Sequence, residues 1–391
     1  MRGIAILGAT GSIGRSTLDV VARAPEAFSV EVLSAQRNVD AMAELVQRFR
    51  PRLAIMVDAD AAAALRDRIH DLCPVLSGPQ ALVEGVQQPG VDMVMVAIVG
   101  ACGLAPTLAA AQAGHDILLA TKEALVTAGP LLLAAADAGQ ARLLPIDSEH
   151  NAIFQCLPQD YRCGQRPQGV RRLILTASGG PFRNWSLEAM AQATPAQAVA
   201  HPKWDMGRKI SVDSATMMNK GLELIEAAYL YDLPAASVDI LIHPQSIVHS
   251  LVEYADGSQL AQLGSTDMRI PIAHALHFPE RGPSGAQSLD LAQVGQLEFS
   301  APDTQRFPAL RLARAALESG GIAPAVLNAA NEIAVAGFLE QRIGFGDISA
   351  LVEHTLETSQ AWSQDLPDLE AAIAVDARAR DVARQWEAAH A

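Results

Sequence analysis

Residues 201–223 bring together cationic, hydroxyl, amide and carboxylate side chains with little apolar material between them. Ordering such a polar segment is costly unless it holds a polar ligand. Hydroxyls, an amide and an ammonium beside a helix N-terminus suit a phosphate group, and a carboxylate one turn further along suits a metal ion. The segment therefore predicts a site for a phosphorylated, metal-bound small molecule.

The second half of this segment has the pattern of a helix start. We expect Asp213 or Ser214 to be the N-cap, because Asp and Ser side chains accept hydrogen bonds from free backbone amides. Asn219 and Glu223 are four residues apart and share one face of such a helix. The preceding residues 201–208 are predicted to form a flap whose tryptophan covers a bound ligand. Simple packing of that indole is the alternative.

Three acidic side chains are candidates for the metal site. Asp147 and Glu149 follow a predicted strand, and ligands of open α/β sheets bind at the carboxyl ends of strands. In an extended chain, residues two apart point to the same side, so these two converge, and Glu223 completes the set. Three carboxylates repel one another unless protons or a cation are present, and an all-oxygen set favours Mg²⁺ or Mn²⁺ over Zn²⁺. Capping of a following helix by the two neighbouring acids is the alternative.

A glycine-rich turn follows the first predicted strand and opens a helix. It reads Gly8-Ala9-Thr10-Gly11-Ser12-Ile13-Gly14. Glycines in this position let the backbone turn tightly and approach a pyrophosphate, which then lies at the helix N-terminus. The spacing differs from the usual G-x-G-x-x-G, and a merely tight turn is the alternative. The context of strand, glycines, helix and second strand favours a dinucleotide site.

The end of the second predicted strand distinguishes NAD from NADP. An NAD site places Asp or Glu there to bind the ribose 2′-hydroxyl. This chain has Arg37 and Asn38 instead, and no acid in that turn. A cation and an amide fit a 2′-phosphate, so the predicted cofactor is NADP(H). Arg37 as an ordinary solvated residue is the alternative.

Further polar groups also follow predicted strands. Lys122 is placed to reach a substrate oxygen, and Ser178, with the two glycines after it, to contact a phosphate. A surface helix start and a plain turn are the respective alternatives. For His243, a structural hydrogen-bonded role explains its position as well as a catalytic one does.

The periodicity of the chain predicts the elements that carry these motifs. Residues 1–150 alternate short apolar runs with amphipathic segments, which is typical of a parallel sheet wrapped by helices, here a Rossmann-like NADP-binding domain. Residues 151–285 form a predicted α/β catalytic domain, residues 286–305 a linker, and residues 306–391 an α-helical domain. The fold class is therefore α/β. The strands predicted in the first part are 3–7, 29–33, 53–57, 93–99, 116–120 and 142–146.

The composition excludes several classes of protein. A net charge of −14 and a pI near 5.1 argue against a nucleic-acid or anionic-membrane surface. The longest uncharged run, 93–115, is broken by glycines and Pro106 and predicts no membrane span. Four cysteines at no metal-like spacing favour buried thiols and a reducing cytoplasm.

Taken together, these motifs resemble the 1-deoxy-D-xylulose 5-phosphate reductoisomerase family over essentially the whole chain. The resemblance is carried by 8–14, the Lys122-Glu123 pair, 145–151, 178–183, 201–223, 243–250 and 307–339. Two positions depart from the family pattern, in which Asn precedes the Lys-Glu pair and Gly precedes the cofactor cation. Thr121 and Gln36 stand there, so cofactor contacts at these positions are left open.

The resemblance implies roles for individual residues. The residues implied to contact NADPH are Thr10, Gly11, Ser12, Ile13, Arg37, Asn38, Glu123 and Gly207. The implied ligands of Mn²⁺ or Mg²⁺, with Co²⁺ as a further candidate, are Asp147, Glu149 and Glu223. Ser148 and Lys122, together with the ligands Glu149 and Glu223, are implied at the carbonyl and hydroxyl end of the substrate. The residues implied to hold its phosphate are Ser178, His201, Ser214, Asn219 and Lys220.

The implied activity is the NADPH- and metal-dependent rearrangement and reduction of 1-deoxy-D-xylulose 5-phosphate to 2-C-methyl-D-erythritol 4-phosphate. Lys122 is the candidate for moving a proton at the substrate hydroxyl, and a homodimer is implied by the family alone. A thiolate dehydrogenase of the semialdehyde type is a second interpretation and needs Cys102 or Cys156 as nucleophile. A non-catalytic NADP-binding sensor is a third, which needs neither Lys220 nor the carboxylates.

Overall fold

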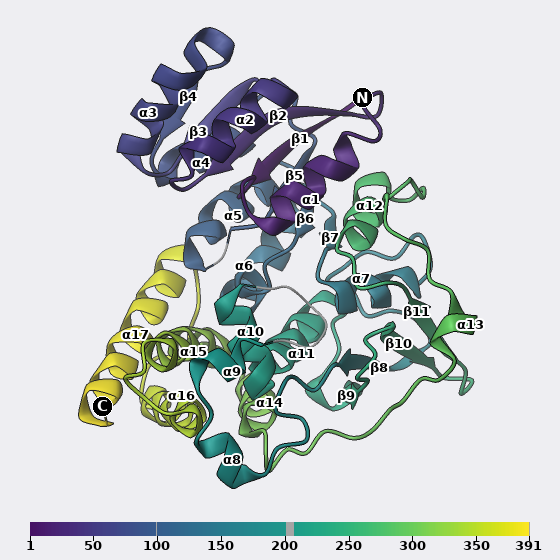
Figure 1. The fold of residues 1–391 in the computed structure, drawn as a ribbon, viewed down its shortest axis with the longest axis vertical. Coiled ribbons are helices and arrows are strands. Elements are labelled where there is room, and N and C mark those ends of the chain that lie inside the picture. Colours follow the sequence, from purple (N-terminus) through teal and green to yellow (C-terminus); the bar gives the residue numbers. More distant parts are fainter. Residues whose placement is uncertain (99, 201–206, 391) are drawn as a thin grey trace.

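The computed structural model describes residues 1–98, 100–200 and 207–390. It contains a seven-stranded sheet, a four-stranded sheet and a group of long C-terminal helices, arranged side by side (Figure 1). The predicted α/β class, with a Rossmann-like first part, a central α/β part and a helical last part, is confirmed.

Seven parallel strands form the first sheet, in the order β4-β3-β2-β1-β5-β6-β7. Their bounds are β1 Arg2–Leu7, β2 Phe28–Ala35, β3 Leu53–Met56, β4 Val75–Ser77, β5 Met93–Val96, β6 Asp116–Leu119 and β7 Leu143–Pro145. The chain extends the sheet from β1 through β4, then crosses to the other side of β1 with β5. The order therefore reverses between β1 and β5, which is where open parallel sheets bind ligands.

Six of these seven strands agree with the prediction, with ends that differ by a few residues. β4 was not predicted, because a three-residue strand is too short to show a periodic pattern. β5 ends at Val96, earlier than predicted.

The side chains of β1 alternate between two hydrophobic cores, as a strand buried on both faces requires. Ile4 and Ile6 pack into one core, and Ala5 and Leu7 into the other. The first core is covered by α1 Ser12–Val21, α2 Val39–Phe49, α3 Ala59–Ile69 and α12 Arg269–His277. The second is covered by α4 Pro79–Val86, α5 Leu104–Gln112 and α6 Glu123–Gly139. None of the described helices is long and apolar enough to cross a membrane.

The second sheet has the order β11-β10-β8-β9, with β8 and β9 parallel and the other pairs antiparallel. Its strands are β8 Val170–Ala177, β9 Val238–Ile242, β10 Val248–Tyr254 and β11 Gln259–Leu263. The predicted hairpin is confirmed, and Gly257 in its turn has a φ of +86°, which favours glycine. The helices of this part are α7 Ser148–Gln155, α8 Leu187–Ala191, α9 Pro195–Ala198, α10 Arg208–Thr216 and α11 Met218–Leu230.

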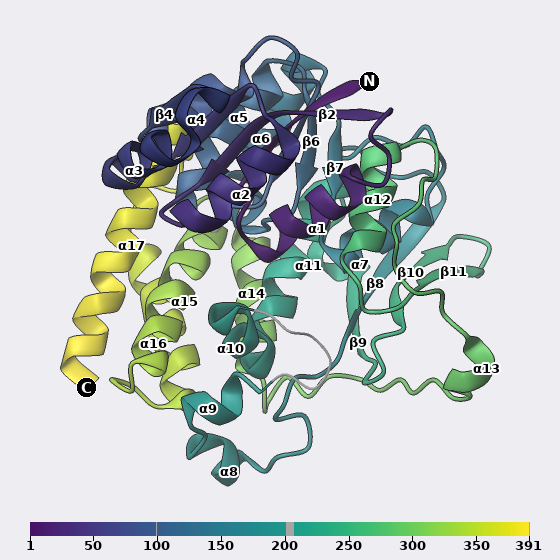
Figure 2. The same ribbon diagram turned by 45° about the horizontal axis from the view of Figure 1, so that its top comes forward.

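Four helices follow: α14 Pro308–Ser319, α15 Ala323–Leu339, α16 Phe345–Ser359 and α17 Leu369–His390. Helix α14 begins with a proline and is followed by Gly320 at a φ of +64°, the usual pattern of helix ends. In Figures 1 and 2, α17 runs along the outer edge of the molecule beside α15 and α16. Helix α15 also contacts α6 and α10, so the last part of the chain packs against helices of the first and central parts.

The segment 286–305, predicted to be a linker, contains the short helix α13 Leu291–Val294 and an isolated bridge between Ser300 and Ile242. Helix α12, within the predicted central domain, packs on the first sheet. The division into 1–150, 151–285, 286–305 and 306–391 stays a prediction.

Candidate active site

A cleft of about 420 Å³ lies at the carboxyl ends of β6, β7 and β8, between the start of α1 and helices α10 and α11. The predicted site residues that line it are Ser12, Ile13, Lys122, Asp147, Ser148, Glu149, Ser178, Gly207, Ser214, Asn219, Lys220 and Glu223. The predicted residues outside its lining are Thr10, Gly11, Arg37, Asn38 and Glu123. His201 and the rest of the predicted flap through residue 206 lie outside the described residues.

The glycine-rich turn has a physical need for its glycines. Gly8 has a φ of +87°, and a Cβ there would stand 2.4 Å from the Ala97 carbonyl oxygen. A Cβ on Gly14 would stand 2.5 Å from the Gly8 oxygen. Gly11 is the N-cap of α1 and has no side chain to bind the first amides of that helix. No capping side chain therefore satisfies those amides, and a helix N-terminus of this kind suits an anion.

Arg37 lies after the end of β2, and 76 % of its side chain is exposed. Its Nε donates to Asp58 Oδ2 at 2.9 Å. The Ala61 amide and then Arg37 lower the pKa of Asp58. Asn38 accepts a hydrogen bond from the Ala41 amide and so caps α2. The sequence showed no acid beside Arg37 because this one comes from the turn after the next strand.

The three predicted carboxylates converge. Oxygens of Asp147, Glu149 and Glu223 all lie within 4.8 Å of one another. The expected reason was wrong: β7 ends at Pro145, so Asp147 is the N-cap of α7 and Glu149 lies in its first turn. A helix start, and not an extended chain, brings the two together. Asp147 makes no capping hydrogen bond, so its carboxylate remains directed to the cluster.

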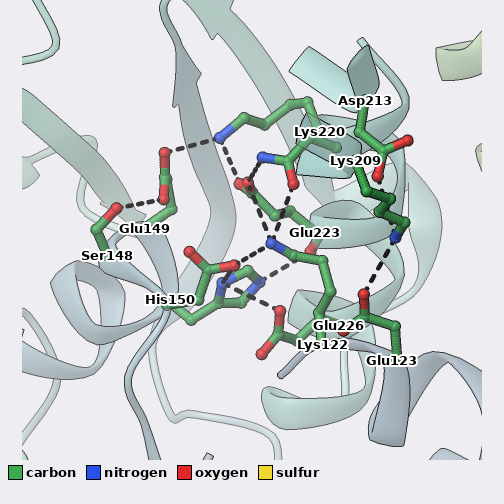
Figure 3. Close-up of polar contacts among 12 residues, drawn as sticks. Lys122, Glu123, Ser148, Glu149, His150, Lys209, Asp213, Lys220, Glu223 and Glu226 are labelled. Atoms are coloured by element: carbon green, nitrogen blue, oxygen red, sulfur yellow. Dashed lines mark hydrogen bonds and ion pairs between the residues drawn. The ribbon is translucent and has the colours of Figure 1, made fainter. Parts of the chain in front are cut away.

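Two lysines lie among these acids (Figure 3). Lys122 Nζ is 2.6 Å from Asp147 Oδ2 and 3.8 Å from Glu223 Oε1. Lys220 Nζ is 3.0 Å from Glu149 Oε1 and also donates to Glu223. Asn219 joins the two groups, because its Oδ1 accepts from Lys122 at 3.1 Å and its Nδ2 donates to Glu223 at 2.5 Å. The predicted sharing of one helix face by Asn219 and Glu223 is confirmed.

The carboxylates of this cluster differ in their affinity for protons. Burial and repulsion from Glu149 raise the pKa of Glu223 to about 8, although Lys220 opposes them. Burial acts in the same direction on Asp147, but Lys122, together with His150 and Lys220, outweighs it and lowers the pKa of Asp147. Burial would lower the pKa of Lys122, yet Asp147 and Glu223 raise it. The lysines therefore do not fully compensate the negative charge of Glu223. Three converging carboxylates with uncompensated negative charge fit a hard divalent cation.

Two buried residues behind the cluster were not predicted. His150 Nε2 is 2.9 Å from the backbone oxygen of Glu223, and its Nδ1 is 3.5 Å from Glu226 Oε2. Neither oxygen of Glu226 has a hydrogen-bond partner among the described residues. Burial, with repulsion from Asp147, raises the pKa of Glu226 well above its usual range, and burial lowers the pKa of His150 to about 4. The spacing of Glu226, three residues after Glu223 on one helix, was the available signal.

The predicted helix start at Asp213 or Ser214 is wrong. Both residues lie within α10, and α11 begins at Met218 after Met217, whose φ is +65°. The Oγ1 of Thr216 accepts a hydrogen bond from the Met218 amide, so a hydroxyl does serve the start of α11. The break between the helices turns the first residues of α11 toward the cleft.

The turn after β8 lies against α10. Gly180 has a φ of +67°, and a Cβ there would stand 2.4 Å from the Ser214 carbonyl oxygen. Its amide donates to Ser178 Oγ at 3.2 Å. Ser178 therefore reaches the cleft from the turn after β8, and Ser214 reaches it from α10. These two elements can pack this closely only because residue 180 has no side chain.

His243 and His249 have different surroundings. His243 accepts from the amides of Ile247 and Val248 through Nε2, and its ring stacks on Phe299, which favours the structural role. His249 lines the cleft and was not singled out from the sequence.

The cysteines form no disulfide, and all four lie within the described residues. The expectation that they are buried is wrong, since Cys102 is exposed and the other three are half-buried. Burial raises the pKa of Cys156 to about 11 and also raises that of Cys102. Neither residue lines the cleft, so neither has the environment of an activated thiolate.

The glycine turn and the carboxylate–lysine cluster open into one cleft. The fold and site thus define an α/β enzyme of the dinucleotide-dependent oxidoreductase class with a divalent-cation centre. The chain belongs to the 1-deoxy-D-xylulose 5-phosphate reductoisomerase family. The family model of that name matches residues 4–129, and two models of its C-terminal domains match residues 143–231 and 263–382.

Relatives and solved structures agree with this assignment. The chain is 55% identical to 1-deoxy-D-xylulose 5-phosphate reductoisomerase of Methylococcus capsulatus over 99% of this chain and 98% of that protein. It is 57% identical to the enzyme of Aromatoleum aromaticum over 97% and 95%. The Zymomonas mobilis enzyme in complex with NADPH has a TM-score of 0.91 at 48% identity, covering 99% of each chain. A reductoisomerase complex with NADPH, fosmidomycin and magnesium has a TM-score of 0.94 at 46% identity, covering 99% of this chain and 98% of that one.

Proposed function

We propose that this chain converts 1-deoxy-D-xylulose 5-phosphate to 2-C-methyl-D-erythritol 4-phosphate with NADPH and a divalent metal ion. The observation that carries the proposal is the convergence of three carboxylates and two lysines in a cleft that also contains the start of α1. Family membership agrees with it.

Asp147, Glu149 and Glu223 are the proposed ligands of Mg²⁺ or Mn²⁺, with Co²⁺ as a further candidate. When bound, the ion polarises the substrate carbonyl and stabilises the negative charge that develops on it, and NADPH supplies the hydride. Ser148 lies between the first two ligands in sequence and lines the cleft, where its hydroxyl can orient the substrate.

Lys122 is the proposed group that moves or holds a proton at the substrate hydroxyl. It is the N-cap of α6 and lines the cleft. Its ammonium contacts the carboxylate of Asp147, one of the proposed metal ligands. The raised pKa of Lys122 keeps it charged at neutral pH, so it acts first as a hydrogen-bond donor.

The proposed phosphate site combines Ser178, Ser214, Asn219 and Lys220, all in the lining, with His201. Binding the phosphate far from the reacting carbons positions the substrate and supplies energy for the chemical step. On the cofactor side the proposed contacts are Thr10, Gly11, Ser12, Ile13, Arg37, Asn38, Glu123 and Gly207.

The direct experiment is to follow loss of NADPH absorbance with 1-deoxy-D-xylulose 5-phosphate, with and without Mn²⁺. Turnover should disappear with EDTA and return with Mn²⁺. A protein that binds NADPH but shows no metal-restored turnover would instead be the NADP-binding sensor. Loss of activity on changing Cys102 and Cys156 together to Ser would favour the semialdehyde-type enzyme.

We also infer a homodimer that works in the cytoplasm on a small phosphorylated sugar. Strand β11 is an edge strand with no neighbour beyond it in the described sheet, and Leu260 on it is half exposed. Leu291 and Phe299 are exposed as well, and α13 and β11 lie on the same side of the molecule in Figures 1 and 2. A second copy would cover this edge. Light scattering of wild type and Leu260→Glu tests this, and equal masses for both proteins would contradict it.

A further inference from the structure

A second charged cluster adjoins the metal cluster and has a different composition. Glu123 is the first residue of α6 and is 7% exposed. Its Oε1 accepts a hydrogen bond from Lys209 Nζ at 3.1 Å, whereas its neighbour Lys122 points to Asp147. Figure 3 shows that Lys122 and Glu123, although adjacent in the chain, make contacts with different residues: Lys122 with the metal cluster and Glu123 with Lys209.

Lys209 lies in the first turn of α10, two residues after Gly207. Besides Glu123, its ammonium contacts Asp213 Oδ2 at 3.0 Å, one turn along the same helix. Asp213 is 1% exposed, and its Oδ1 accepts from Asn331 Nδ2 of α15 at 2.7 Å. The ammonium of Lys209 therefore joins α10 to α6 directly and to α15 through Asp213, and these helices belong to the central, first and last parts of the chain.

The charges of this cluster depend on one another. Burial alone would lower the pKa of Lys209, but Asp213 and Glu123 raise it above its usual range. Burial would raise the pKa of Glu123, but Lys209 and Lys122 lower it. Lys209 is thus the cation in contact with both buried carboxylates. Removing it leaves Glu123 with Lys122 as its remaining cation and Asp213 with the hydrogen bond from Asn331.

The location of α10 gives this contact a consequence for the site. Gly207 at one end of the helix and Ser214 near the other both line the cleft, and they are the proposed cofactor and phosphate contacts. The position of α10 relative to α6 therefore sets where Gly207 and Ser214 lie relative to Glu123, the proposed cofactor contact on α6. Among the described residues, Lys209 of α10 forms the ion pair that joins α10 to α6, through Glu123, and it also pairs with Asp213 of its own helix.

We propose that Lys209 is a positioning residue that holds the cofactor side and the phosphate side of the site in register. This rests on the function proposed above. Lys209 does not line the cleft; it fixes the carboxylate of Glu123 and the placement of α10. The metal cluster is held by other contacts, through Lys122, Asn219 and Lys220, none of which involves Lys209.

The test compares Lys209→Met, which removes the charge but keeps much of the length, with Lys209→Arg, which keeps the charge. Measured quantities are the NADPH Kd from cofactor fluorescence, KM and kcat for 1-deoxy-D-xylulose 5-phosphate, and the Mn²⁺ Kd. For Lys209→Met we expect NADPH Kd and substrate KM each to rise about 10-fold or more, as small misplacements of binding groups do. Mn²⁺ affinity should stay within about 2-fold, because the ligands keep their partners. Lys209→Arg should restore most of both losses.

Arg380 provides the matched control. It is 20% exposed against 23% for Lys209, pairs with Asp376 four residues before it, and reaches Glu332 of α15. Arg380→Met should lower thermal stability and leave NADPH Kd and substrate KM unchanged. If Lys209→Met does not fold, the charge-compensated double variant Asp213→Asn/Lys209→Met replaces it, with the same expectation for both ligands, because Asp213 is the other carboxylate that Lys209 contacts and is not a proposed ligand contact.

Unchanged NADPH Kd and KM in the Lys209 variants, or equal changes in Arg380→Met, would overturn the proposal. A Lys209→Met protein that loses Mn²⁺ affinity as strongly as NADPH affinity would also overturn it, since that is general destabilisation. Wild-type turnover is measured in the same series. An inactive wild type refutes the proposed function, whereas an active wild type with unaffected Lys209 variants refutes only the positioning role.

Discussion

The metal cluster in the cleft and the proposed cofactor contact Arg37, which lies outside the lining of the cleft, carry their charges in different surroundings. On the metal side, three carboxylates and two lysines contact one another, and Glu223 is 1% exposed. On the cofactor side, Arg37 is mostly exposed and is paired with Asp58 alone among the described residues. A buried charge depends on its immediate partners, whereas an exposed one is screened by water and salt. Changes on the metal side should therefore abolish function, and changes at Arg37 should alter preference.

The largest effect is expected for Glu223→Gln. Glutamine keeps the shape but removes one of three negative ligands and leaves Lys220 and Lys122 with less compensation. We expect kcat to fall by about 10³-fold or more, because the charge-stabilising centre is lost. The NADPH Kd from cofactor fluorescence should stay close to that of wild type.

The control for that variant is Glu253→Gln. Glu253 is also a buried carboxylate, 5% exposed, but it pairs with Arg172 in the second sheet and does not line the cleft. It should lose stability and keep turnover. Equal losses of kcat in the two variants would show that Glu223 matters only for folding.

The next effect is a pH dependence of metal binding. Below its pKa of about 8, Glu223 carries a proton that a cation must displace, so Mn²⁺ affinity should rise with pH and level off above that value. The expected gain is about 10-fold per pH unit between pH 6 and pH 8, by proton linkage. The lowered pKa of Asp147 adds no slope in this range. Manganese titration monitored by electron paramagnetic resonance measures it, and a flat profile would contradict the raised pKa.

The raised pKa of Glu223 also predicts how the stability of the metal-free protein changes with pH. A raised carboxyl pKa favours the protonated folded state, so its contribution is present below the usual value of 4.5 and is lost as pH rises toward 8. Saturating Mn²⁺ should remove that loss, as urea unfolding at the two ends of the range can show.

A smaller effect is expected for Gly180→Ala. A Cβ at this position meets the Ser214 carbonyl, so the turn after β8 must move away from α10. We expect kcat/KM for the substrate to fall by about 10- to 100-fold through misplacement of the phosphate contacts. NADPH affinity should be unaffected.

Gly257→Ala separates this clash from backbone strain. Gly257 also has a positive φ, +86°, but a Cβ there meets nothing within 4 Å. It should cost about 1 kcal/mol of stability and leave kinetics unchanged. Similar kinetic losses in both variants would remove the role assigned to the contact between Gly180 and Ser214.

The smallest effect concerns Arg37→Ala. Loss of the guanidinium should weaken NADPH binding by about 10-fold and leave NADH binding nearly unchanged, because only NADPH has the 2′-phosphate. Fluorescence titration with both cofactors measures the ratio of their affinities. Equal losses for the two would mean that Arg37 serves only its pair with Asp58.

The sequence allowed prediction of those parts of the site that depend on local pattern. The glycine turn follows from residues within one strand–helix connection, and Asp147 and Glu149 are only two residues apart in the chain. The helix start was misplaced because Asp213 has the right chemistry for an N-cap but is used in a contact with Asn331, 118 residues away. His150 with Glu226, and Glu123 with Lys209, were missed for the same reason. Such pairs exist only once α6, α7, α10 and α11 have packed.

Diffraction from a crystal grown with Mn²⁺, collected for the anomalous signal of manganese, tests the metal centre most directly. The expected result is one anomalous peak among the carboxylates of Asp147, Glu149 and Glu223, with Lys220 displaced from the position it has between two of them. A peak elsewhere, or Glu223 turned away from the other two with no density among them, would contradict the proposed chemistry.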